Sequence, residues 1–284
     1  TQETLYPLLG RIVLPVGISF FTFQALSYVI DVYRRRVPPA RSWIDFANFL
    51  AFFPQLVAGP IVRAEHLVGQ MEAMPRREMR IEAERALFLI LCGLFKKTVI
   101  ANALAMRLAD PVFAWPEAYS GPDLLLGVYG YALQIYCDFS AYSDIAIGTA
   151  LLLGFHFPVN FDAPYFAATL QDFWRRWHIS LSSWLRDYLY IPLGGSRHAA
   201  PRTYANLLAT FLLGGLWHGA AWTFVLWGAF HGLYLSLERL LRGRRPPAAA
   251  AAPPGLLRQV AMRCWIFHVV CFSWILFRGG NLET

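Results

Sequence analysis

Apolar runs without a charged residue alternate with short arginine-rich segments along most of this chain. Residues 12–30 form the first run, and three consecutive arginines follow at 34–36. Because a helix of about 20 apolar residues crosses a bilayer, the run predicts a membrane-spanning helix, made irregular by Pro15 and Gly17. Arginine-rich flanks are typical of cytoplasmic loops, so the loop after this helix is predicted to lie inside.

The next two runs differ in regularity. Residues 46–62 are interrupted by two prolines and a glycine, and arginines flank them on both sides. Irregular backbone at membrane depth persists only where protein buries it, so we interpret this stretch as a segment that dips into the membrane and returns. Residues 86–106 predict a full span, which contains the adjacent lysines Lys96 and Lys97.

Two carboxylates interrupt the following run. Residues 107–123 contain three acidic and few basic residues, which places them outside, and residues 124–153 return through the membrane. Asp138 and Asp144 lie inside this span, where a charge is costly unless it has a partner. On an ideal helix they point about 120° apart, so they are not an obvious acid–base pair. Structural pairing with arginine is at least as good an interpretation.

The second half of the chain predicts a helical hairpin. Residues 154–202 are arginine-rich and are predicted to lie inside. Residues 204–237 contain no Asp, Glu, Lys or Arg, and as one helix they would be about 50 Å long, beyond a hydrocarbon core of about 30 Å. Basic flanks on both sides favour a break near the glycines between 214 and 219, which places His218 deep in the membrane. After a linker rich in Pro and Ala, residues 264–277 predict a last partial span.

The composition supports a membrane protein. Of the 284 residues, 57% are hydrophobic and 15% are charged, and the mean hydropathy is +0.41. An ordinary soluble domain is about a quarter charged, so both a soluble domain and a disordered chain are excluded. The net charge of +7 fits cytoplasmic loops and lipid headgroups better than a nucleic-acid surface. The four cysteines form no CxxC pair, so neither a disulfide framework nor a zinc site is expected.

One cytoplasmic segment combines arginine with aromatic residues. If residues 172–188 formed one helix, a single face would carry Trp174, Trp177, His178, Leu181, Leu185 and Tyr188. Asp172 is expected to pair with Arg175 or Arg176, three or four residues later. An interfacial amphipathic helix with a core histidine explains this pattern. The floor of a cavity for an anionic, phosphate-bearing donor explains it equally well, with Arg175 and Arg176 holding the phosphates and Trp177 and Asp172 as further substrate-binding residues.

His218 is the candidate general base. A histidine at membrane depth indicates a functional site, and neutral imidazole removes a proton from a hydroxyl near neutral pH. A packed, hydrogen-bonded histidine is the competing interpretation. His231 follows 13 residues later, about 220° around an ideal helix, so the two do not bind a metal from one face. No Walker, GxGxxG, GxSxG or HExxH motif is present.

The sequence resembles the membrane-bound O-acyltransferase (MBOAT) family, and specifically its alginate O-acetyltransferase branch. The resemblance rests on the strings LPVGISFFTFQALSYVIDVYR, FFPQLVAGPIVR, YCDFSAYSDIAIG, FPVNFDAPYFA, DFWRRWHISLSSWLRDYLYIPLGGSR and LLGGLWHGAAWTFVLWGAFHG. It implies an all-α, polytopic membrane protein with a ring of transmembrane and re-entrant helices around a tunnel. It also implies that residues 1–284 are one MBOAT membrane domain, an internal part of a longer protein, with His218 as the catalytic histidine and His178 assisting.

The resemblance further implies an activity and its partners. It implies transfer of an acetyl group from a cytoplasmic thioester, with acetyl-CoA as donor and no bound cofactor or metal, for O-acetylation of an exopolysaccharide such as alginate. The expected location is the bacterial inner membrane, and the expected partners are membrane lipids, periplasmic acetyltransferase proteins and the polysaccharide. Three alternatives remain: a transporter or flippase for a lipid-linked sugar or polymer, a subunit that only recruits acetylation enzymes, and a D-alanyl transfer protein of the same superfamily.

Overall fold

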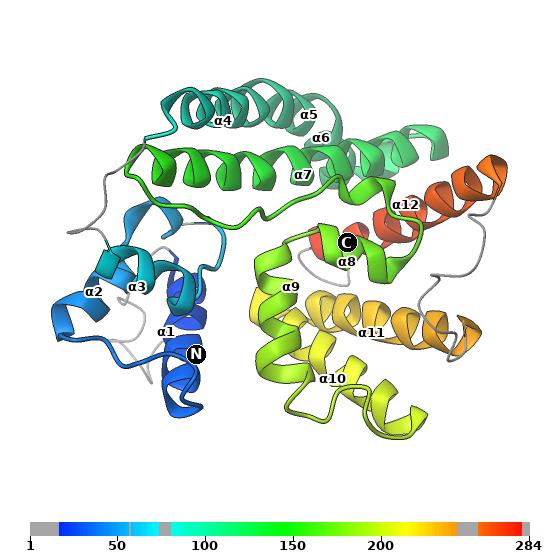
Figure 1. Ribbon diagram of the computed structural model, residues 1–284. Coiled ribbons are helices and arrows are strands. Elements are labelled where there is room, and N and C mark those ends of the chain that lie inside the picture. Colours follow the sequence, from blue (N-terminus) through cyan, green and yellow to red (C-terminus); the bar gives the residue numbers. More distant parts are fainter. Residues whose placement is uncertain (1–16, 57, 74–80, 243–254, 280–284) are drawn as a thin grey trace, which may run out of the picture.

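The computed structural model describes residues 17–56, 58–73, 81–242 and 255–279, and these are helical with connecting loops and no β-strand. Figure 1 shows three groups of helices: a long pair, α4–α6 with α7, and two groups that lie on the same side of this pair, α1–α3 near one end and α8–α12 near the other. The all-α class predicted from the sequence is confirmed for the described part of the chain.

The long pair consists of two nearly continuous helices. The first runs from 83 to 114 as α4 (Ala83–Phe95), α5 (Asn102–Leu104) and α6 (Asp110–Ala114), joined by π-helical segments at Lys96–Ala101 and Ala105–Ala109. The second is α7 (Gly121–Leu152), whose N-terminus is capped by Ser120 and Asp123. The first helix contains the predicted run 86–106, and α7 contains the run 124–153 except its last residue.

Two lysine–aspartate pairs join these helices. Lys96 lies 2.5 Å from Asp144, and Lys97 pairs with Asp138. Lys96 also donates a hydrogen bond of 2.8 Å to Ser140. The partners of the two carboxylates are therefore lysines from the neighbouring helix, and the expectation of arginine partners is wrong. The 120° offset between the carboxylates is accommodated because the lysines project from the π-helical segment, where the helix is locally wider.

The N-terminal group consists of α1 (Ile18–Tyr33), α2 (Trp43–Ala51), a short 3₁₀ turn (Phe53–Gln55) and α3 (Ala64–Ala73). The predicted helix over 12–30 is confirmed from Ile18 onward, and residues 12–16 lie outside the described residues. The predicted irregularity of 46–62 is also found, because α2 ends at Ala51 and Pro54 lies in the 3₁₀ turn. Re-entry into a membrane stays a prediction.

The C-terminal group contains the predicted hairpin. It consists of α10 (Ala200–His218) and α11 (Trp222–Arg242), followed by α12 (Leu256–Arg278). The break between α10 and α11 lies at 219–221, and Gly214 and Gly215 lie inside α10. At Gly215 the two helices are so close that a Cβ atom would lie 2.2 Å from the carbonyl oxygen of Phe224. These glycines therefore serve helix packing, which is why the break falls after them.

The predicted single helix over 172–188 is wrong. The chain forms α8 (Leu170–Arg176) and α9 (Ile179–Leu185), followed by a π-helical turn at Arg186–Tyr190. The two helices are separated at His178, whose φ of 44° is left-handed. The break is caused by a residue far away in the sequence. Asn160 accepts hydrogen bonds from the N–H groups of Ile179 and Ser180, and so a new helix starts there.

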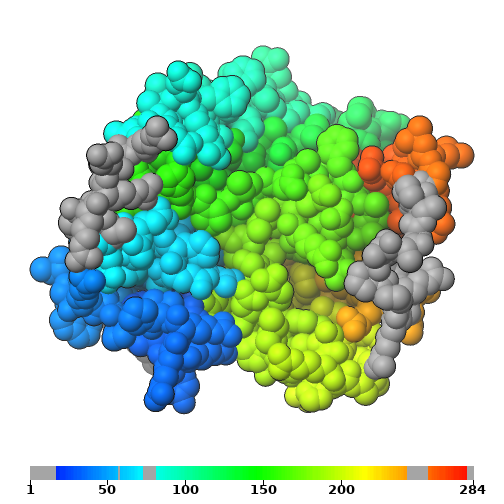
Figure 2. Space-filling model, in the orientation of Figure 1, coloured from blue at the N-terminus to red at the C-terminus, as the bar shows by residue number. Residues whose placement is uncertain are grey.

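The helix α9 connects the N-terminal and C-terminal groups. The indole N–H of Trp184 donates to the carbonyl of Phe23 at 3.0 Å, and the two rings stack 4.1 Å apart. In the space-filling view the blue α1 region lies against the yellow-green region of α9 and α10 (Figure 2).

Two described helices, Ala83–Ala114 and Leu256–Arg278, are long and apolar enough to cross a membrane.

Candidate active site

His218 ends α10 inside an aromatic cage. Its imidazole centroid lies 4.7 Å from that of Trp217, 5.3 Å from Trp227 and 5.0 Å from Phe277. The ring of Phe224 completes the cage at 6.1 Å. The cage draws on α10, α11 and α12, so the hairpin and the last helix together position this histidine. His218 is partly accessible and has no hydrogen-bond partner among the described residues.

His178 lies at the junction of α8 and α9 and is only 2% exposed. Its Nδ1 atom is 3.2 Å from Oδ1 of Asn160 and 3.4 Å from Oγ of Ser180. The edge of the ring meets Phe139 at 4.6 Å, and Phe20 stacks at 6.4 Å. His178 is thus held on one side by polar groups and surrounded by phenylalanine on the others.

The structure brings the two predicted histidines into one interior region. Phe20 contacts both the imidazole of His178 and the indole of Trp217, the residue before His218. Residues 40 positions apart in the sequence therefore face a common apolar space, which α1 closes with Phe20 and Phe23.

A third histidine belongs to the same region. His231 of α11 is completely buried, and its Nδ1 atom accepts a hydrogen bond of 3.3 Å from the indole N–H of Trp174. Trp227 lies between His231 and His218, at 4.7 and 5.3 Å. The aromatic face predicted for residues 172–188 is therefore divided, because Trp174 turns toward His231.

Several buried nitrogen atoms of this region have no hydrogen-bond partner. Within the described residues they are Nε2 of His178, Nε2 of His231 and the indole nitrogens of Trp217, Trp227 and Trp274. Buried polar groups are almost always paired in folded proteins, so five such atoms around one aromatic site indicate a place for a polar substrate. In the described part of the chain, no group of three His, Cys, Asp or Glu could hold a metal ion.

The predicted donor-binding residues have different surroundings. Arg176 binds Asp172 at 3.0 Å and reaches Asp162, so the expected pairing with Asp172 is confirmed. Trp177 is buried in an aromatic core against Phe173 and Trp274. Arg175 is exposed, and no ion pair to it is found among the described residues. Of this set, only Arg175 presents a free charge.

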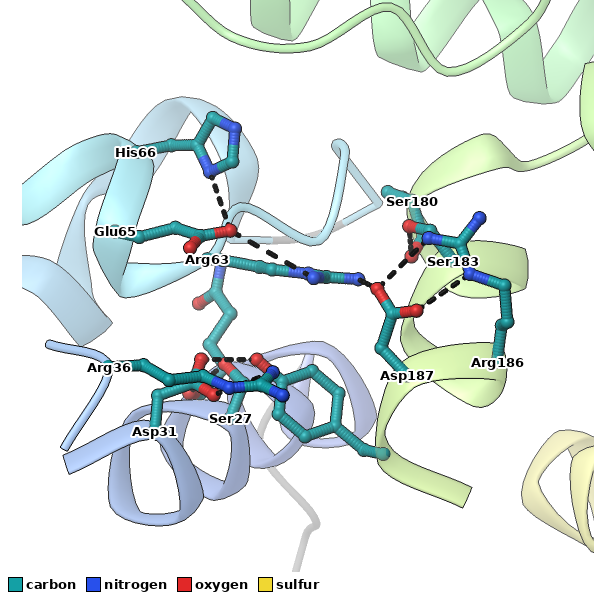
Figure 3. A network of polar contacts seen from close by, with 12 residues as sticks. Ser27, Asp31, Arg36, Arg63, Glu65, His66, Ser180, Ser183, Arg186 and Asp187 are labelled. Carbon is teal, nitrogen blue, oxygen red and sulfur yellow. Dashed lines mark hydrogen bonds and ion pairs between the residues drawn. The ribbon is translucent and has the colours of Figure 1, made fainter. Parts of the chain in front are cut away.

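A second set of arginines lines a cavity that the sequence did not reveal. It has a volume of about 540 Å³ and is lined by Arg34, Arg36, Asp187, Ile191, Pro192, Gly194, Arg197 and His198. Figure 3 shows the ion pairs beside it: Arg63 binds Asp187 at 2.7 Å, and Arg186 binds the same carboxylate at 2.6 Å. Because Asp187 is already neutralised, the remaining lining charge is positive.

Asn160 is a buried polar residue beside His178 that sequence reasoning missed. It is 1% exposed and contacts both His178 and Ser180. It lies in a loop between α7 and α8, where the sequence has no periodic hydrophobic pattern that would indicate a buried residue. The string FPVNFDAPYFA, which contains it, supported only the family resemblance. An asparagine in a loop is usually a turn residue, so only the contact to His178 distinguishes it.

Sequence similarity to known acyltransferases extends over nearly the whole chain. The chain is 47% identical to the probable alginate O-acetylase AlgI of Azotobacter vinelandii over 96% of its length and 52% of that protein. It is 38% identical to the peptidoglycan O-acetyltransferase of Helicobacter pylori, over 99% of the chain and 56% of the relative. It is 29% identical to the teichoic acid D-alanyltransferase of Streptococcus thermophilus, over 93% and 68%. The chain spans about half the length of the first two relatives.

A sequence model of the membrane-bound O-acyltransferase family matches residues 39–277, which include the long helix pair and both histidines of the common interior region. Together with the identity to proteins named as acyltransferases, this match covers most of the chain. The chain therefore belongs to the membrane-bound O-acyltransferase family.

Proposed function

We propose that the protein containing this chain is an O-acetyltransferase of the bacterial inner membrane that acts in O-acetylation of an exopolysaccharide such as alginate. The observation that carries the proposal is the apolar interior region in which Phe20 contacts both His178 and Trp217, the neighbour of His218, with unpaired nitrogen atoms around it. The 47% identity to a probable alginate O-acetylase supports an acetyl group as cargo. The 29% identity to a D-alanyltransferase makes an aminoacyl group the weaker choice.

The reaction follows from the properties of imidazole. The oxygen of an acceptor hydroxyl attacks the carbonyl carbon of an acetyl thioester while neutral His218 takes the hydroxyl proton. The tetrahedral intermediate then collapses, the carbon–sulfur bond breaks, and His218 returns the proton to the thiolate. The products are an acetate ester and a free thiol, and the histidine is regenerated. The aromatic cage keeps water from the thioester, which protects it from hydrolysis.

The direction of transfer belongs to the same proposal. A ring of helices around a tunnel would let the donor, acetyl-CoA, enter from the cytoplasm and the acceptor from outside. The acceptor is either the polysaccharide or a serine of a periplasmic acetyltransferase protein that passes the acetyl group on. Lipids surround the protein, which crosses the membrane several times.

The donor is anionic, and two places suit its phosphates. Arg175 has an exposed and unpaired guanidinium in the described structure. The cavity lined by Arg34, Arg36 and Arg197 also has an excess of positive charge. Arginine binds phosphate oxygens through two parallel N–H groups, which suits either place. Arg176 and Trp177, which are engaged in contacts within the protein, would shape the surroundings instead.

The test uses the full-length protein in membrane vesicles that contain its partner proteins, with labelled acetyl-CoA. Wild-type protein is expected to release CoA and to transfer label, and His218→Ala is expected to lose both. His66→Ala is the matched control, because His66 is an exposed histidine on α3 and should keep wild-type rates. Equal rates in wild type and His218→Ala would exclude His218 as the base. Movement of a lipid-linked sugar without use of the thioester would favour the transporter alternative.

A further inference from the structure

The orientation of the Asn160 side chain is fixed by its neighbours. The backbone N–H of Ser180 can only donate, and it lies 3.1 Å from the Asn160 atom assigned as Oδ1. On the other side, Nδ2 of Asn160 donates to Oγ of Ser143 at 3.0 Å. A flipped amide would set two donors against each other at Ser180. Oδ1 of Asn160 is therefore the atom that faces His178.

This orientation determines which nitrogen of His178 has the proton. A carbonyl oxygen only accepts hydrogen bonds, and it lies 3.2 Å from Nδ1 of His178. Nδ1 must therefore be the donor. The hydroxyl of Ser180 does not compete, because it accepts from the N–H of Ile61 at 3.0 Å and donates to Asn160 at 2.9 Å. Neutral His178 is thus in the Nδ1–H tautomer.

The opposite nitrogen of His178 then has a free lone pair. Nε2 is buried and has no hydrogen-bond partner among the described residues. The ring lies among Phe20, Phe139 and Phe161, none of which offers a hydrogen bond to it. Nε2 can therefore accept a hydrogen bond from a molecule that enters the interior region, and in this tautomer it cannot donate one.

We propose that Asn160 is a positioning residue that keeps the proton of His178 on Nδ1, so that Nε2 accepts a hydrogen bond from a hydroxyl of the acceptor substrate. The inference rests on the proposed function for the identity of the substrate, and it deepens that proposal by assigning unlike roles to the two histidines. His178 binds and orients the acceptor through a lone pair, and His218 removes the proton of the hydroxyl that reacts.

The first experiment determines the tautomer of His178 directly and does not depend on acetyl transfer. The full-length protein is labelled with ¹⁵N-histidine and its ring nitrogens are observed by NMR, with the His178 signals assigned by their loss in His178→Gln. Wild type is expected to show a protonated Nδ1 and an unprotonated Nε2. Asn160→Leu is expected to reverse them, because the hydroxyl of Ser180, 3.4 Å from Nδ1, then donates to that atom. Wild-type His178 with its proton on Nε2, or no reversal in Asn160→Leu, would overturn the proposal.

The second experiment measures kinetics with labelled acetyl-CoA and deacetylated alginate oligosaccharides as the acceptor probe. Loss of one hydrogen bond to the substrate is expected to raise the acceptor KM about fivefold to tenfold in Asn160→Leu, with kcat changed much less. Asn160→Asp keeps an oxygen toward His178 and should restore the KM. Ser236→Ala is the control, since it removes a part-buried hydroxyl of α11 whose hydrogen bond goes to the carbonyl of Gly232. A loss confined to kcat, or no rescue by Asn160→Asp, would contradict the proposal.

The two experiments separate failure of this inference from failure of the proposed function. If wild-type protein transfers no acetyl group to any acceptor, the proposed function fails while the tautomer remains measurable. If Asn160→Leu does not fold, as judged by gel filtration and its unfolding temperature, the wild-type tautomer and the Asn160→Asp variant still decide the question.

Discussion

At the scale of single residues, a buried carboxylate joins α1 to the segment after α9. Asp31 is 2% exposed, and its Oδ2 atom accepts a hydrogen bond from the hydroxyl of Tyr188. Its other oxygen has no hydrogen bond, although Arg36 lies 3.9 Å away (Figure 3). The stability of this contact therefore depends mainly on one hydroxyl group.

The Tyr188→Phe variant tests this contact. Removing the hydroxyl leaves the buried carboxylate without its hydrogen bond, so we expect the free energy of unfolding to fall by about 1–3 kcal/mol. Thermal unfolding in detergent measures the change. Tyr33→Phe is the control, because Tyr33 is 88% exposed on the same helix as Asp31 and should leave stability unchanged. An equal effect of the two substitutions would show that the Asp31 contact contributes nothing.

Asp187 gives the neighbouring network a dependence on pH. Burial alone raises the pKa of Asp187, but hydrogen bonds from Arg186 and Arg63 outweigh it and hold the pKa below its ordinary value of 3.8. A carboxyl group with a lowered pKa stabilises the fold above its ordinary pKa and loses that contribution as the pH falls through the folded-state pKa. We expect Asp187→Asn to be less stable than wild type at pH 7 and the difference to shrink below about pH 4. Unfolding midpoints measured across this range test the expectation.

Sequence reasoning at the residue scale singled out His218 and His178, which stay predicted site residues, and it did not single out Asn160. The histidines were visible because imidazole is unusual in an apolar segment. Asn160 was not, because its importance arises from Ser143 and Ser180, which lie 17 and 20 residues away in the chain. Such a cluster has no linear pattern, and it forms only when α7, the loop and α9 pack together.

At the scale of elements, glycines set the distance between α10 and α11. At Gly228 an added Cβ atom would lie 2.3 Å from the carbonyl oxygen of Phe211, and at Gly232 it would lie 2.9 Å from the Cα atom of Leu208. The two backbones therefore pack directly against each other. This contact fixes the hairpin whose turn follows His218.

The Gly228→Ala variant tests this packing. The added methyl group meets backbone rather than a flexible side chain, so the helices must separate, and we expect a loss of about 1–3 kcal/mol in stability. Gly69→Ala is the control, since Gly69 is also in a helix but has no atom within 4 Å of an added Cβ. That control should be neutral or up to about 1 kcal/mol more stable. Equal unfolding midpoints for Gly228→Ala and Gly69→Ala would contradict the packing argument.

The hydrophobic runs predicted the positions of most helices. They failed to predict a helix boundary that is set by a contact with a residue far away in the sequence. The runs 86–106 and 124–153 correspond to long helices, and residues 204–237 do form a hairpin. The interruption at His178 was not predicted, because the local sequence continues the helical pattern across it. The hydrogen bonds that Asn160 accepts from the N–H groups of Ile179 and Ser180 override that local preference.

At the scale of the whole molecule, two ion pairs hold the long helices together. Lys96 and Asp144 are each about a quarter exposed, and the second pair, Lys97 with Asp138, is about a third exposed. Removing one member of an ion pair in such a partly apolar setting destabilises the protein, because the charge of the other member is left unpaired. The sequence showed all four charges but not their partners, because pairing depends on the π-helical segment that turns both lysines toward α7.

A double-mutant cycle tests the coupling. We expect Lys96→Met and Asp144→Leu each to destabilise the protein by about 1–3 kcal/mol, because each leaves one charge unpaired. The double variant should recover part of the loss, which gives a coupling free energy of about 1 kcal/mol or more. Unfolding midpoints of the four proteins measure it. Strict additivity of the two single effects would show that the charges act independently.

If α7 spans the membrane, as its apolar run predicts, the same ion pairs have a consequence for how the chain enters the membrane during synthesis. A lysine or aspartate at the centre of a helix raises the cost of its insertion by the translocon by about 2.5–3.5 kcal/mol. The helix from 83 to 114 has both lysines near its middle, and α7 has both aspartates. Either helix alone would enter lipid with unpaired charges, whereas the two together enter with all four of these charges paired. We therefore expect them to leave the translocon as one unit, so that a nascent chain ending at residue 118 integrates poorly and one ending at residue 153 integrates well.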